Sequence, residues 1–470
     1  MSRPAARVAV IGGGISGLAA AHHLVELSRT GGRPIDLRLF EAGERLGGVI
    51  ATECRDGFVI ETGPDSFLSE KPAALALCER LGLTDRLVGT REEFRRTYVV
   101  REGRLQVLPD GFLLLAPTRL WPLVATPLFS WPGKLRMALD LVLPRGSGDD
   151  ESLGSFVRRR LGREALERVA QPLIGGIYTA DPERLSLRAT MPRFLEMEQA
   201  QGSIIAAMWR QQRAARRRTA DSGARWSLFL SFDAGLQVLV DALAQRLPEG
   251  VVQLRRPVAS LARSARGTWR VDEFECDAVI VATPAHAAAT LLHPLDAELG
   301  AELSAIEYAS SAIASLIFRR EDIPHPLDGF GFVVPRIEGR LLLAGTFSSL
   351  KYPGRAPAEY VLVRAFLGGA LQPEVLALDD GALLTAVHGE LEALLGIRRP
   401  PQRSVLTRWP AAMPQYHVGH LERVARITRR GAAHPGLALA GNAYAGVGIP
   451  DCIRSGEAAA EMIVAGLSAK

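Results

Sequence analysis

Near the N-terminus, a short apolar run leads into three closely spaced glycines, Gly12, Gly14 and Gly17. The apolar residues 8–11 predict a buried strand, and residues 18–27 predict a helix. Between a strand and a helix, the first glycine permits a tight turn, the second lets the backbone approach a pyrophosphate, and the third allows the helix and strand to pack closely. The helix N-terminus adds unpaired N–H groups and a positive dipole end. The segment therefore predicts a dinucleotide-binding unit.

An acidic residue follows the next predicted strand. Residues 35–40 end at Glu41, whose carboxylate can accept hydrogen bonds from a ribose. The distance from Gly17 to Glu41 is somewhat longer than the usual spacing of about 20 residues. We expect the turn at residues 28–34 to absorb the excess.

Later parts of the chain have the same character. Residues 251–261 and 278–283 predict strands in the middle of the chain, and residues 437–442 predict a buried strand that ends at glycine. A helix is expected over residues 452–465. One dinucleotide domain assembled from three separated stretches explains this pattern better than three domains.

Composition narrows the class of protein. The chain has 470 residues, enough for two or three domains, and its four cysteines lack CxxC spacing. We therefore expect no disulfide framework, no zinc site and a reducing compartment. The first strand begins so early that we expect no signal peptide before it. The net charge of +5 suits an acidic ligand or an anionic membrane surface, whereas no motif favours nucleic acid.

An apolar stretch at residues 111–131 is nearly long enough to span a bilayer. Pro117, Pro122 and Pro127 would interrupt a spanning helix, so we reject a transmembrane segment. Two interpretations stay open: a surface that dips into a membrane, or a buried helical subdomain. The membrane interpretation takes Trp121 and Trp131 as interfacial anchors, with Arg119, Lys134 and Arg136 at the headgroups.

Further motifs extend the dinucleotide site. Glu41 is followed by Arg45 and by a second glycine pair at residues 47–48, which lets the chain pass beside a large dinucleotide. Residues 63–66, Gly-Pro-Asp-Ser, form a rigid turn that suits the edge of a flat ring. Residues 441–448 repeat the glycine-rich pattern before the C-terminal helix, so backbone N–H groups again approach an anionic ligand edge.

With these three segments the chain resembles the flavin amine oxidase superfamily, in which FAD is bound by an N-terminal glycine loop, a Glu-Ala-x-x-Arg-x-Gly-Gly segment and a C-terminal glycine-rich segment. Within the superfamily it resembles the protoporphyrinogen oxidase family over essentially the whole chain. The more selective motifs are residues 63–66, 176–186, 232–237, 329–335, 366–369, 409–420 and 441–453.

The resemblance implies an α/β fold in three parts. These are a discontinuous, Rossmann-like FAD-binding domain, an α+β substrate-binding domain, and an inserted, mostly helical, membrane-associating domain. The expected boundaries are residues 1–72, 230–292 and 402–470 for the FAD-binding domain, 73–110 and 293–401 for the substrate-binding domain, and 111–229 for the helical domain.

Noncovalent FAD is the cofactor that the resemblance implies. Its expected contacts lie in the three glycine-rich segments, in the 63–66 turn and at Val258, whose backbone faces the adenine. They are Gly12, Gly13, Gly14, Ile15, Ser16, Gly17, Glu41, Ala42, Arg45, Gly48, Val49, Gly63, Pro64, Asp65, Ser66, Val258, Val447, Gly448 and Ile449.

The implied activity is the oxidation of protoporphyrinogen IX to protoporphyrin IX in haem biosynthesis. Hydride passes from the substrate to flavin N5, and molecular oxygen takes the electrons and becomes hydrogen peroxide. Coproporphyrinogen III oxidation to coproporphyrin III is the alternative, and another amine oxidase or a carotenoid desaturase is a further one. The intact glycines at all three cofactor segments argue against a noncatalytic flavoprotein or a membrane scaffold.

The implied substrate site has apolar walls for a flat macrocycle, with Val333 and Phe366 on either side and Gly331 lining the pocket. The substrate's propionates require a cation. The sequence departs from the family pattern here, because Thr97 stands where an arginine usually precedes an aromatic-valine pair. Either Arg96 takes that role through a small shift, or the carboxylates are held differently.

We predict no catalytic acid or base, because pyrrole N–H protons can pass to water. His417 and His420 form a His-x-x-His pair without the glutamate of a zinc protease, so no metal is expected. Cys452 is expected to be a small buried residue rather than a point of flavin attachment.

The expected partners are a porphyrinogen, molecular oxygen and, through peripheral contact, the anionic surface of the cytoplasmic membrane. Nucleic acid is not expected. A homodimer is compatible with the resemblance.

Overall fold

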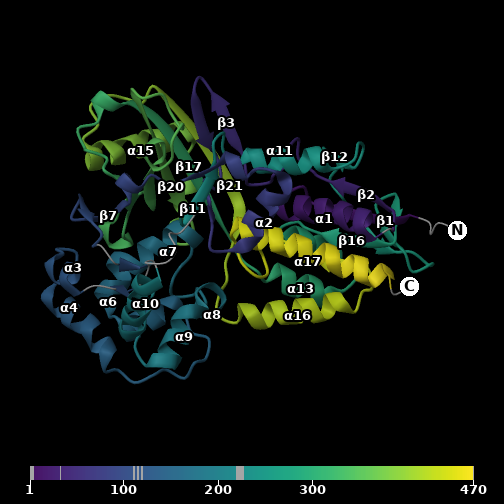
Figure 1. The fold of residues 1–470 in the computed structure, drawn as a ribbon, viewed down its shortest axis with the longest axis horizontal. Helices are drawn as coiled ribbons and strands as arrows, with labels where there is room; N and C mark the ends of the chain where they lie inside the picture. The colour runs from purple at the N-terminus through teal and green to yellow at the C-terminus, as the bar shows by residue number, and fades with distance from the viewer. Residues whose placement is uncertain are drawn as a thin grey trace.

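The computed structural model describes residues 5–31, 33–109, 112–113, 116–117, 120–218 and 227–468. The molecule is elongated, and both termini lie at its narrow end (Figure 1). The opposite end divides into a lobe that contains a large sheet and a lobe of helices.

A five-stranded parallel sheet organises the narrow end. In β1, Val8 and Val10 face one core cluster, whereas Ala9 and Ile11 face another. The strand is buried on both faces, which explains why its sequence is continuously apolar rather than alternating. The strand order is β12 (Val252–Gln253), β2 (Ile35–Phe40), β1 (Ala6–Ile11), β16 (Ala278–Val281) and β22 (Leu437–Leu439).

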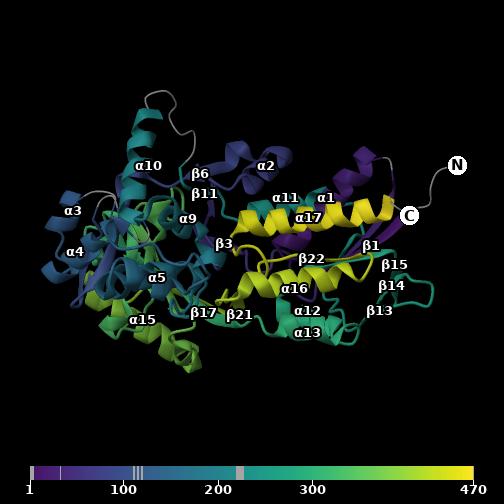
Figure 2. The same cartoon turned by 90° about the horizontal axis from the view of Figure 1, so that it is seen from below.

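Two helices, α1 (Ile15–Gly31) and α17 (Ile449–Ser468), lie side by side over this sheet (Figure 2). Gly456 of α17 lies against the carbonyl of Ser16 at the start of α1. At the other end, Arg33 donates to the carbonyl oxygen of Leu467. The helices are therefore parallel, with both N-termini directed toward the same end of the sheet. At 1.5 Å per residue, α17 begins roughly 10 Å beyond the start of α1.

A seven-stranded sheet forms the core of the second lobe. One face packs on α15 (Asp380–Leu395) through a cluster that includes Val363 and Leu391. The other face carries Val99 and Val333 and packs against the helical lobe. The strand order is β21 (Arg403–Pro414), β17 (Tyr308–Arg319), β20 (Tyr360–Gly368), β19 (Ala344–Phe347), β18 (Gly329–Val333), β7 (Arg96–Arg101) and β8 (Arg104–Val107).

The helical lobe is built from residues between 120 and 218. Serines 130, 152 and 186 cap the N-termini of three of its helices by accepting a backbone N–H three residues on. Arg160, fully buried, donates to Asp140 at 2.6 Å and lies 3.3 Å from Glu198, so the buried charges are paired. The elements are α3 (Leu120–Ala125), α4 (Trp131–Ala138), η3 (Leu139–Leu141), α5 (Leu153–Arg160), α6 (Arg163–Ala165), η4 (Leu166–Ala170), α7 (Gln171–Tyr178), α8 (Leu187–Thr190), α9 (Pro192–Gln201) and α10 (Ile204–Arg218).

The remaining elements connect or cover these units. The strands are β3 (Thr52–Arg55), β4 (Phe58–Glu61), β5 (Phe67–Leu68), β6 (Leu87–Gly89), β9 (Phe112–Leu113), β10 (Ala116–Pro117), β11 (Phe229–Phe232), β13 (Leu261–Arg263), β14 (Trp269–Val271) and β15 (Phe274–Cys276). The helices are α2 (Pro72–Leu81), η1 (Thr84–Arg86), η2 (Glu92–Phe94), α11 (Gln237–Arg246), α12 (Ala285–Leu292), α13 (Ala297–Ser304), η5 (Arg320–Asp322), η6 (Arg336–Glu338), α14 (Ser348–Lys351), η7 (Pro373–Ala377) and α16 (His420–Ala432).

The bounds of two expected elements differ from those in the structure. The extra residues before Glu41 lengthen α1 to Gly31 rather than forming a longer turn. The strand expected over 251–261 is instead two short strands, β12 and β13, in different sheets. In each case the apolar pattern is correct, and tertiary packing determines where the hydrogen bonding stops.

The expected domain boundaries also need two changes. β21 pairs with β17 in the seven-stranded sheet, so residues 403–414 belong to that lobe rather than to the FAD-binding part. α2 packs against α17, and β6 pairs with β11, so this stretch belongs with the narrow end rather than with the substrate-binding part. Both misplacements follow from pairings between residues distant in sequence. Within the described ranges, no helix combines the length and apolar character needed to cross a bilayer.

We predict that Gly456→Ala destabilises the protein, because the new Cβ would overlap the Ser16 carbonyl oxygen. Overpacking of this kind costs about 1–3 kcal/mol. Urea unfolding followed by circular dichroism measures the change.

The matched control is Gly466→Ala in the same helix, where an added Cβ meets no atom within 4 Å. This substitution should be neutral or stabilising by up to about 1 kcal/mol. Equal effects of the two substitutions would contradict the close helix contact.

Candidate functional site

The loop after β1 forms the centre of the candidate site. Gly12 has a positive φ of 107°, and an added Cβ would lie 2.7 Å from the carbonyl oxygen of Ala282. At Gly17, an added Cβ would overlap the carbonyl of Gly12. Gly14 differs, because an added Cβ would meet nothing within 4 Å. The first and third glycines therefore allow tight packing, and the second leaves open space beside the backbone.

The Glu41 carboxylate holds two loops together. One oxygen accepts the N–H of Gly13 and the other accepts the N–H of Gly43, both at 2.7 Å. A carboxylate has further lone pairs, so Glu41 can still accept hydroxyl groups. Ala42 follows in this loop, and Gly47 donates its N–H to the carbonyl of Gly13 at 2.8 Å.

Arg45 binds the backbone of its own loop. Its guanidinium donates to the carbonyl oxygens of Leu46, Gly48 and Ile50 at 3.1, 2.5 and 2.8 Å. The side chain therefore shapes the residues 46–50, and it is not free in this conformation to hold a phosphate by itself.

The turn at residues 63–66 lies against the same loop, since an added Cβ at Gly63 would overlap the carbonyl of Val49. Trp409 Nε1 donates to the carbonyl oxygen of Thr62 at 2.7 Å. Ser66 Oγ donates to Asp65 at 2.8 Å. Nearby cations hold the pKa of the Asp65 carboxyl well below its usual range, although burial opposes this. Pro64 lies between these anchored residues.

The C-terminal segment is tied to the helical lobe through Tyr416. Its hydroxyl donates to the carbonyl of Asn442 at 2.5 Å and accepts the N–H of Gly446 at 2.9 Å. Its ring stacks on His420 at 3.9 Å, and its carbonyl accepts the N–H of Ser186. Tyr416 therefore fixes the loop that leads to Val447, Gly448 and Ile449 at the start of α17.

The remaining expected cofactor residues occupy compatible positions. Ile15 and Ser16 form the first turn of α1, whose N–H groups have no partners within the helix. Val258 is partly buried and, like Phe40, packs against the core cluster that contains Ala9 and Ile11 of β1. Thr283 Oγ1, beside the Gly12 loop, is a buried hydroxyl without a hydrogen-bond partner.

Three expected substrate residues share one face of the seven-stranded sheet. Val333 and Phe366 both contact the core cluster between the sheet and the helical lobe, and so does Val447 from the C-terminal segment. Gly331 pairs with Thr97 on the adjacent strand, and an added Cβ at Gly331 would overlap the carbonyl of Gly345. The structure thus brings the apolar walls and the C-terminal glycine segment together.

The structure does not bring Arg96 to that face. Arg96 precedes Thr97 in β7, and successive residues of a strand point to opposite faces. Its guanidinium instead pairs with Asp328, which also accepts the hydroxyl of Tyr98. Of the two alternatives, this geometry favours the one in which the carboxylates are held by another cation than Arg96, whereas Thr97 lies on the expected face.

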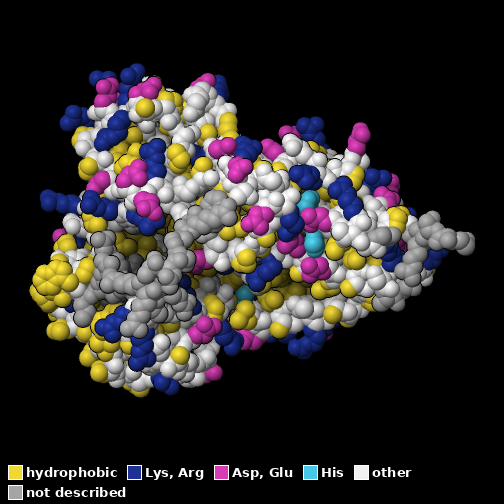
Figure 3. Space-filling model, viewed as in Figure 1, with side chains coloured by type: hydrophobic (Ala, Val, Ile, Leu, Met, Phe, Trp, Pro, Cys, Tyr) yellow, Lys and Arg dark blue, Asp and Glu magenta, His cyan; other side chains and the backbone are white. Residues whose placement is uncertain are grey.

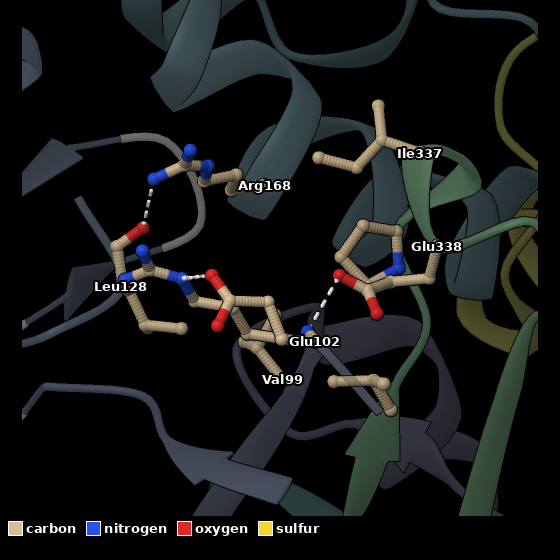
Figure 4. A pocket seen from close by; sticks show the side chains of 9 residues that line it. Val99, Glu102, Leu128, Arg168, Ile337 and Glu338 are labelled. Carbon is tan, nitrogen blue, oxygen red and sulfur yellow. Dashed lines mark hydrogen bonds and ion pairs between the residues drawn. The ribbon is translucent and has the colours of Figure 1, made fainter. Parts of the chain in front are cut away.

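Two other arginines, Arg101 and Arg168, line a cavity beside this face of the sheet. A cavity of about 150 Å³ is lined by Val99, Arg101 and Arg168, among others, between β7 and the helical lobe (Figure 4). Arg101 shares the face of Val99 on β7. Arg168 comes from η4; one of its guanidinium nitrogens donates to Leu128 O at 2.7 Å and to Glu164 at 3.2 Å. Arg101 lies 3.4 Å from Glu102, so each arginine keeps further N–H donors for a ligand. Sequence spacing gave no signal for Arg168, because only the folded chain brings it beside β7.

The contacts of His417, His420 and Cys452 indicate structural roles for these three residues. His417 lies beside Arg184 and Glu307, 3.3 and 3.6 Å away, while His420 is buried under Tyr416. Burial raises the pKa of the Cys452 thiol to about 12, which disfavours a nucleophilic thiolate. Across the described part of the chain, no cluster of three or more His, Cys, Asp or Glu side chains could hold a metal ion.

Comparisons with known proteins define the family. The family model for flavin containing amine oxidoreductase matches residues 15–464. Coproporphyrinogen III oxidase of Bacillus subtilis (strain 168) is 37% identical over 467 residues, covering 98% of each chain. Chloroplastic protoporphyrinogen oxidase of Nicotiana tabacum is 30% identical and covers 98% of this chain and 85% of the relative. A solved structure of a proposed protoporphyrinogen oxidase from Exiguobacterium sp. 255-15 has a TM-score of 0.86 at 31% identity, covering 100% of both chains.

The chain therefore belongs to the flavin containing amine oxidoreductase family. The predictions of an α/β fold, an oxidoreductase and an FAD cofactor are confirmed. The residues at the N-terminus of α1 also fit an FAD cofactor, independently of the comparisons. Open space at Gly14, spare acceptors on Glu41 and the unpaired Thr283 hydroxyl lie together at the N-terminus of α1.

We predict that His420 makes stability depend on pH. Burial lowers the pKa of His420 to about 4, compared with about 6.5 in an unfolded chain. The unfolded state therefore binds the proton more tightly, so the contribution is fully present above pH 6.5 and is lost as the pH falls toward 4. The loss amounts to about 3 kcal/mol.

Urea unfolding of the FAD-loaded protein between pH 4 and 7, compared with His420→Gln, measures this effect. The exposed His293 supplies a matched control, His293→Gln, which should keep the wild-type pH dependence. An identical pH dependence in the wild type and His420→Gln would show that His420 does not contribute.

Proposed function

We propose that this protein oxidises coproporphyrinogen III to coproporphyrin III with FAD in haem biosynthesis, with protoporphyrinogen IX as a second substrate. The observation that carries the proposal is the end-to-end similarity, at 37% identity, to the coproporphyrinogen III oxidase of Bacillus subtilis. The plant protoporphyrinogen oxidase is less similar, at 30%. These comparisons reverse the order expected from the sequence, which placed protoporphyrinogen first.

Bound FAD would supply a two-electron acceptor for the substrate's hydride, with molecular oxygen as the final acceptor. The chain's own part is to hold the dinucleotide along two parallel helices. The N-terminus of α1 and Glu41 bind its phosphate and ribose, and the N-terminus of α17 faces the polar edge of the ring. The 63–66 turn and the Tyr416-anchored loop fix the ring's position.

The sheet face with Val333 and Phe366 holds the macrocycle. An apolar, flat wall excludes water and orients one methylene bridge toward the cofactor. No protein base is required, because the pyrrole N–H proton can pass to water after the hydride has left. Arg101 and Arg168 are the cations that we assign to the substrate's carboxylates.

Oxidation of the two porphyrinogens, followed by porphyrin fluorescence, tests this function. We predict a higher kcat/KM for coproporphyrinogen III than for protoporphyrinogen IX, because its four propionates make fuller use of the two cations. Arg168→Gln should reduce this preference, while Arg340→Gln, which removes a cation outside the cavity, should keep it. Rates no faster than autoxidation for both substrates, in protein that holds FAD, would refute the proposal.

We predict that Phe366→Ala raises KM for the porphyrinogen by about tenfold or more, because it removes an aromatic wall. FAD retention should change much less, since Phe366 contacts the substrate face. Steady-state kinetics and flavin absorbance after gel filtration measure the two effects. Phe58→Ala, at a similarly half-buried phenylalanine packed on Tyr360, is the control and should leave KM unchanged.

We also propose that the helical lobe binds the anionic surface of the cytoplasmic membrane peripherally. Trp121, Trp131, Leu135 and Val142 are 78, 64, 68 and 77% exposed, far more than apolar side chains in a core. Figure 3 shows hydrophobic side chains gathered at the edge where α3 and α4 lie. Lys134 lies 4.7 Å above the Trp131 ring, so a cation accompanies the apolar surface.

Two of the three cations expected at the headgroups do not support the membrane proposal. Arg136 donates to the carbonyls of Arg158, Arg159 and Arg160 at the end of α5, so it caps that helix. Arg119 lies outside the described residues. Lys134 donates one hydrogen bond to the carbonyl of Val124 at 2.7 Å, and because an ammonium has three donors it is the cation that supports the membrane proposal.

Leu135→Ser should weaken binding to anionic phospholipid vesicles by roughly tenfold, because it removes one largely exposed apolar anchor. Cosedimentation with vesicles measures the binding. Met462→Ser, at an exposed aliphatic residue of α17, is the control and should bind like the wild type. A wild-type protein that binds no such vesicle would overturn the membrane proposal and leave the catalytic one intact.

A further inference from the structure

A buried group of charges lies directly behind the 63–66 turn. Asp65 accepts a hydrogen bond from Lys351 Nζ at 3.0 Å, and Arg364 lies 3.4 Å from the same carboxylate. The Arg364 side chain is only 1% exposed, and that of Lys351 is 14% exposed. A guanidinium held this far from water requires compensation from its surroundings.

The compensation for these cations is incomplete. Among the described residues, Asp65 is the sole carboxylate within ion-pair distance of Lys351 or Arg364. The next carboxylate, Glu61, is 3.9 Å from Arg355 and accepts hydrogen bonds from Thr52 and the N–H of Leu236. The two cations that face Asp65 therefore leave one positive charge in excess.

The position of Arg364 links this charge to the ring site. Arg364 donates to the carbonyl oxygen of Gly63, and its guanidinium lies 5.3 Å from the Phe366 ring. Arg364 and Phe366 are two residues apart in β20, so both side chains face the same side of the sheet. Its Nε has no hydrogen-bond partner although it is buried. The excess charge thus lies between the proposed ring turn and the proposed substrate wall.

We propose that Lys351 and Arg364 stabilise the negative charge that a hydride delivers to the flavin. In this proposal, Asp65 neutralises one of the two positive charges and so determines the net positive charge beside the ring. This inference rests on the proposed placement of the ring beside residues 63–66. In the reaction, a methylene C–H bond of the porphyrinogen breaks, and the hydrogen leaves with both electrons. The porphyrinogen is oxidised by two electrons and then loses a pyrrole N–H proton to water.

The flavin is reduced by the same two electrons, and its ring gains one negative charge. A fixed cation in a buried, low-dielectric site lowers the energy of such a charge more than water-exposed cations would. Because the cations are already held by Asp65 and Gly63, they need no reorganisation when the charge arrives.

Sulfite titration of the FAD-loaded protein tests this assignment without turnover. Sulfite adds to a flavin ring and leaves it negatively charged, and the loss of flavin absorbance reports the Kd. We expect Lys351→Gln and Arg364→Gln to weaken sulfite binding by about tenfold or more. Arg364→Lys, which keeps the charge, should recover most of the affinity.

Asp65→Asn supplies the decisive comparison. It removes the negative charge that faces Lys351 and Arg364, so the net positive charge beside the ring increases and sulfite binding should become stronger. Damage to the fold weakens binding in every variant and cannot produce this opposite sign. Arg340→Gln removes a partly buried arginine that pairs with Glu390 on α15, and it should match the wild type.

Unchanged sulfite affinity in Lys351→Gln and Arg364→Gln, with FAD retained, would overturn the inference. So would a wild-type protein that holds FAD but binds no sulfite. Neither result depends on porphyrinogen oxidation, so failure of this inference is distinguishable from failure of the proposed function.

Discussion

The close contact between α1 and α17 is the constraint on which the rest of the structure depends. Gly456 lies against the Ser16 carbonyl, where no side chain would fit. Because the helices are parallel, two dipoles with the same direction lie side by side, which is unfavourable unless an anionic ligand faces their N-termini. The chain thus fixes a site of positive potential before any cofactor binds.

That site is assembled from parts of the chain that are far apart. β1 and Glu41 come from the first residues, while Tyr416 and α17 come from the last. Between them, the chain forms a seven-stranded sheet whose inner face packs on the helical lobe. The proposed cofactor segments and the proposed substrate wall meet where these units join, so we expect any loosening of the helix pair to displace both.

Charge has two separate roles in this arrangement. Arg101 and Arg168 line an open cavity, where cations can bind carboxylates that arrive with a substrate. Lys351 and Arg364 lie behind the 63–66 turn, where both face Asp65 and where we propose that they stabilise charge on a neighbouring ring. Burial differs between the pairs: Arg101 and Arg168 are 27 and 24% exposed, and Lys351 and Arg364 are 14 and 1% exposed, so solvent screens the first pair more than the second.

Much of the fold could be predicted from local sequence. The residues 8–17 and Glu41 have fixed spacing and conformational demands, so the first strand, turn and helix were predicted correctly. The apolar walls at Val333 and Phe366 came from family resemblance rather than from the residues alone.

The rest could not be predicted because it depends on contacts between distant residues. β21 lies in the larger sheet through its pairing with β17. Arg96 was one candidate for binding the substrate's carboxylates. The alternation of side chains along β7 turns it toward Asp328 instead, and this orientation follows only from the strand register. Tyr416 lies in one of the family motifs, but its contact with the C-terminal loop depends on the fold, and Arg168 and Arg364 have no local signal for the roles that we propose.

We propose that one chain places FAD and a porphyrinogen in direct contact at the junction of these units. Anaerobic mixing of the FAD-loaded protein with coproporphyrinogen III tests it most directly. We predict that the flavin absorbance bleaches once, by two electrons, and that coproporphyrin fluorescence develops only after oxygen is admitted, because full oxidation of the porphyrinogen requires the cofactor to be reoxidised between successive hydride transfers. Flavin that stays oxidised, with porphyrin forming no faster than in buffer, would contradict the account.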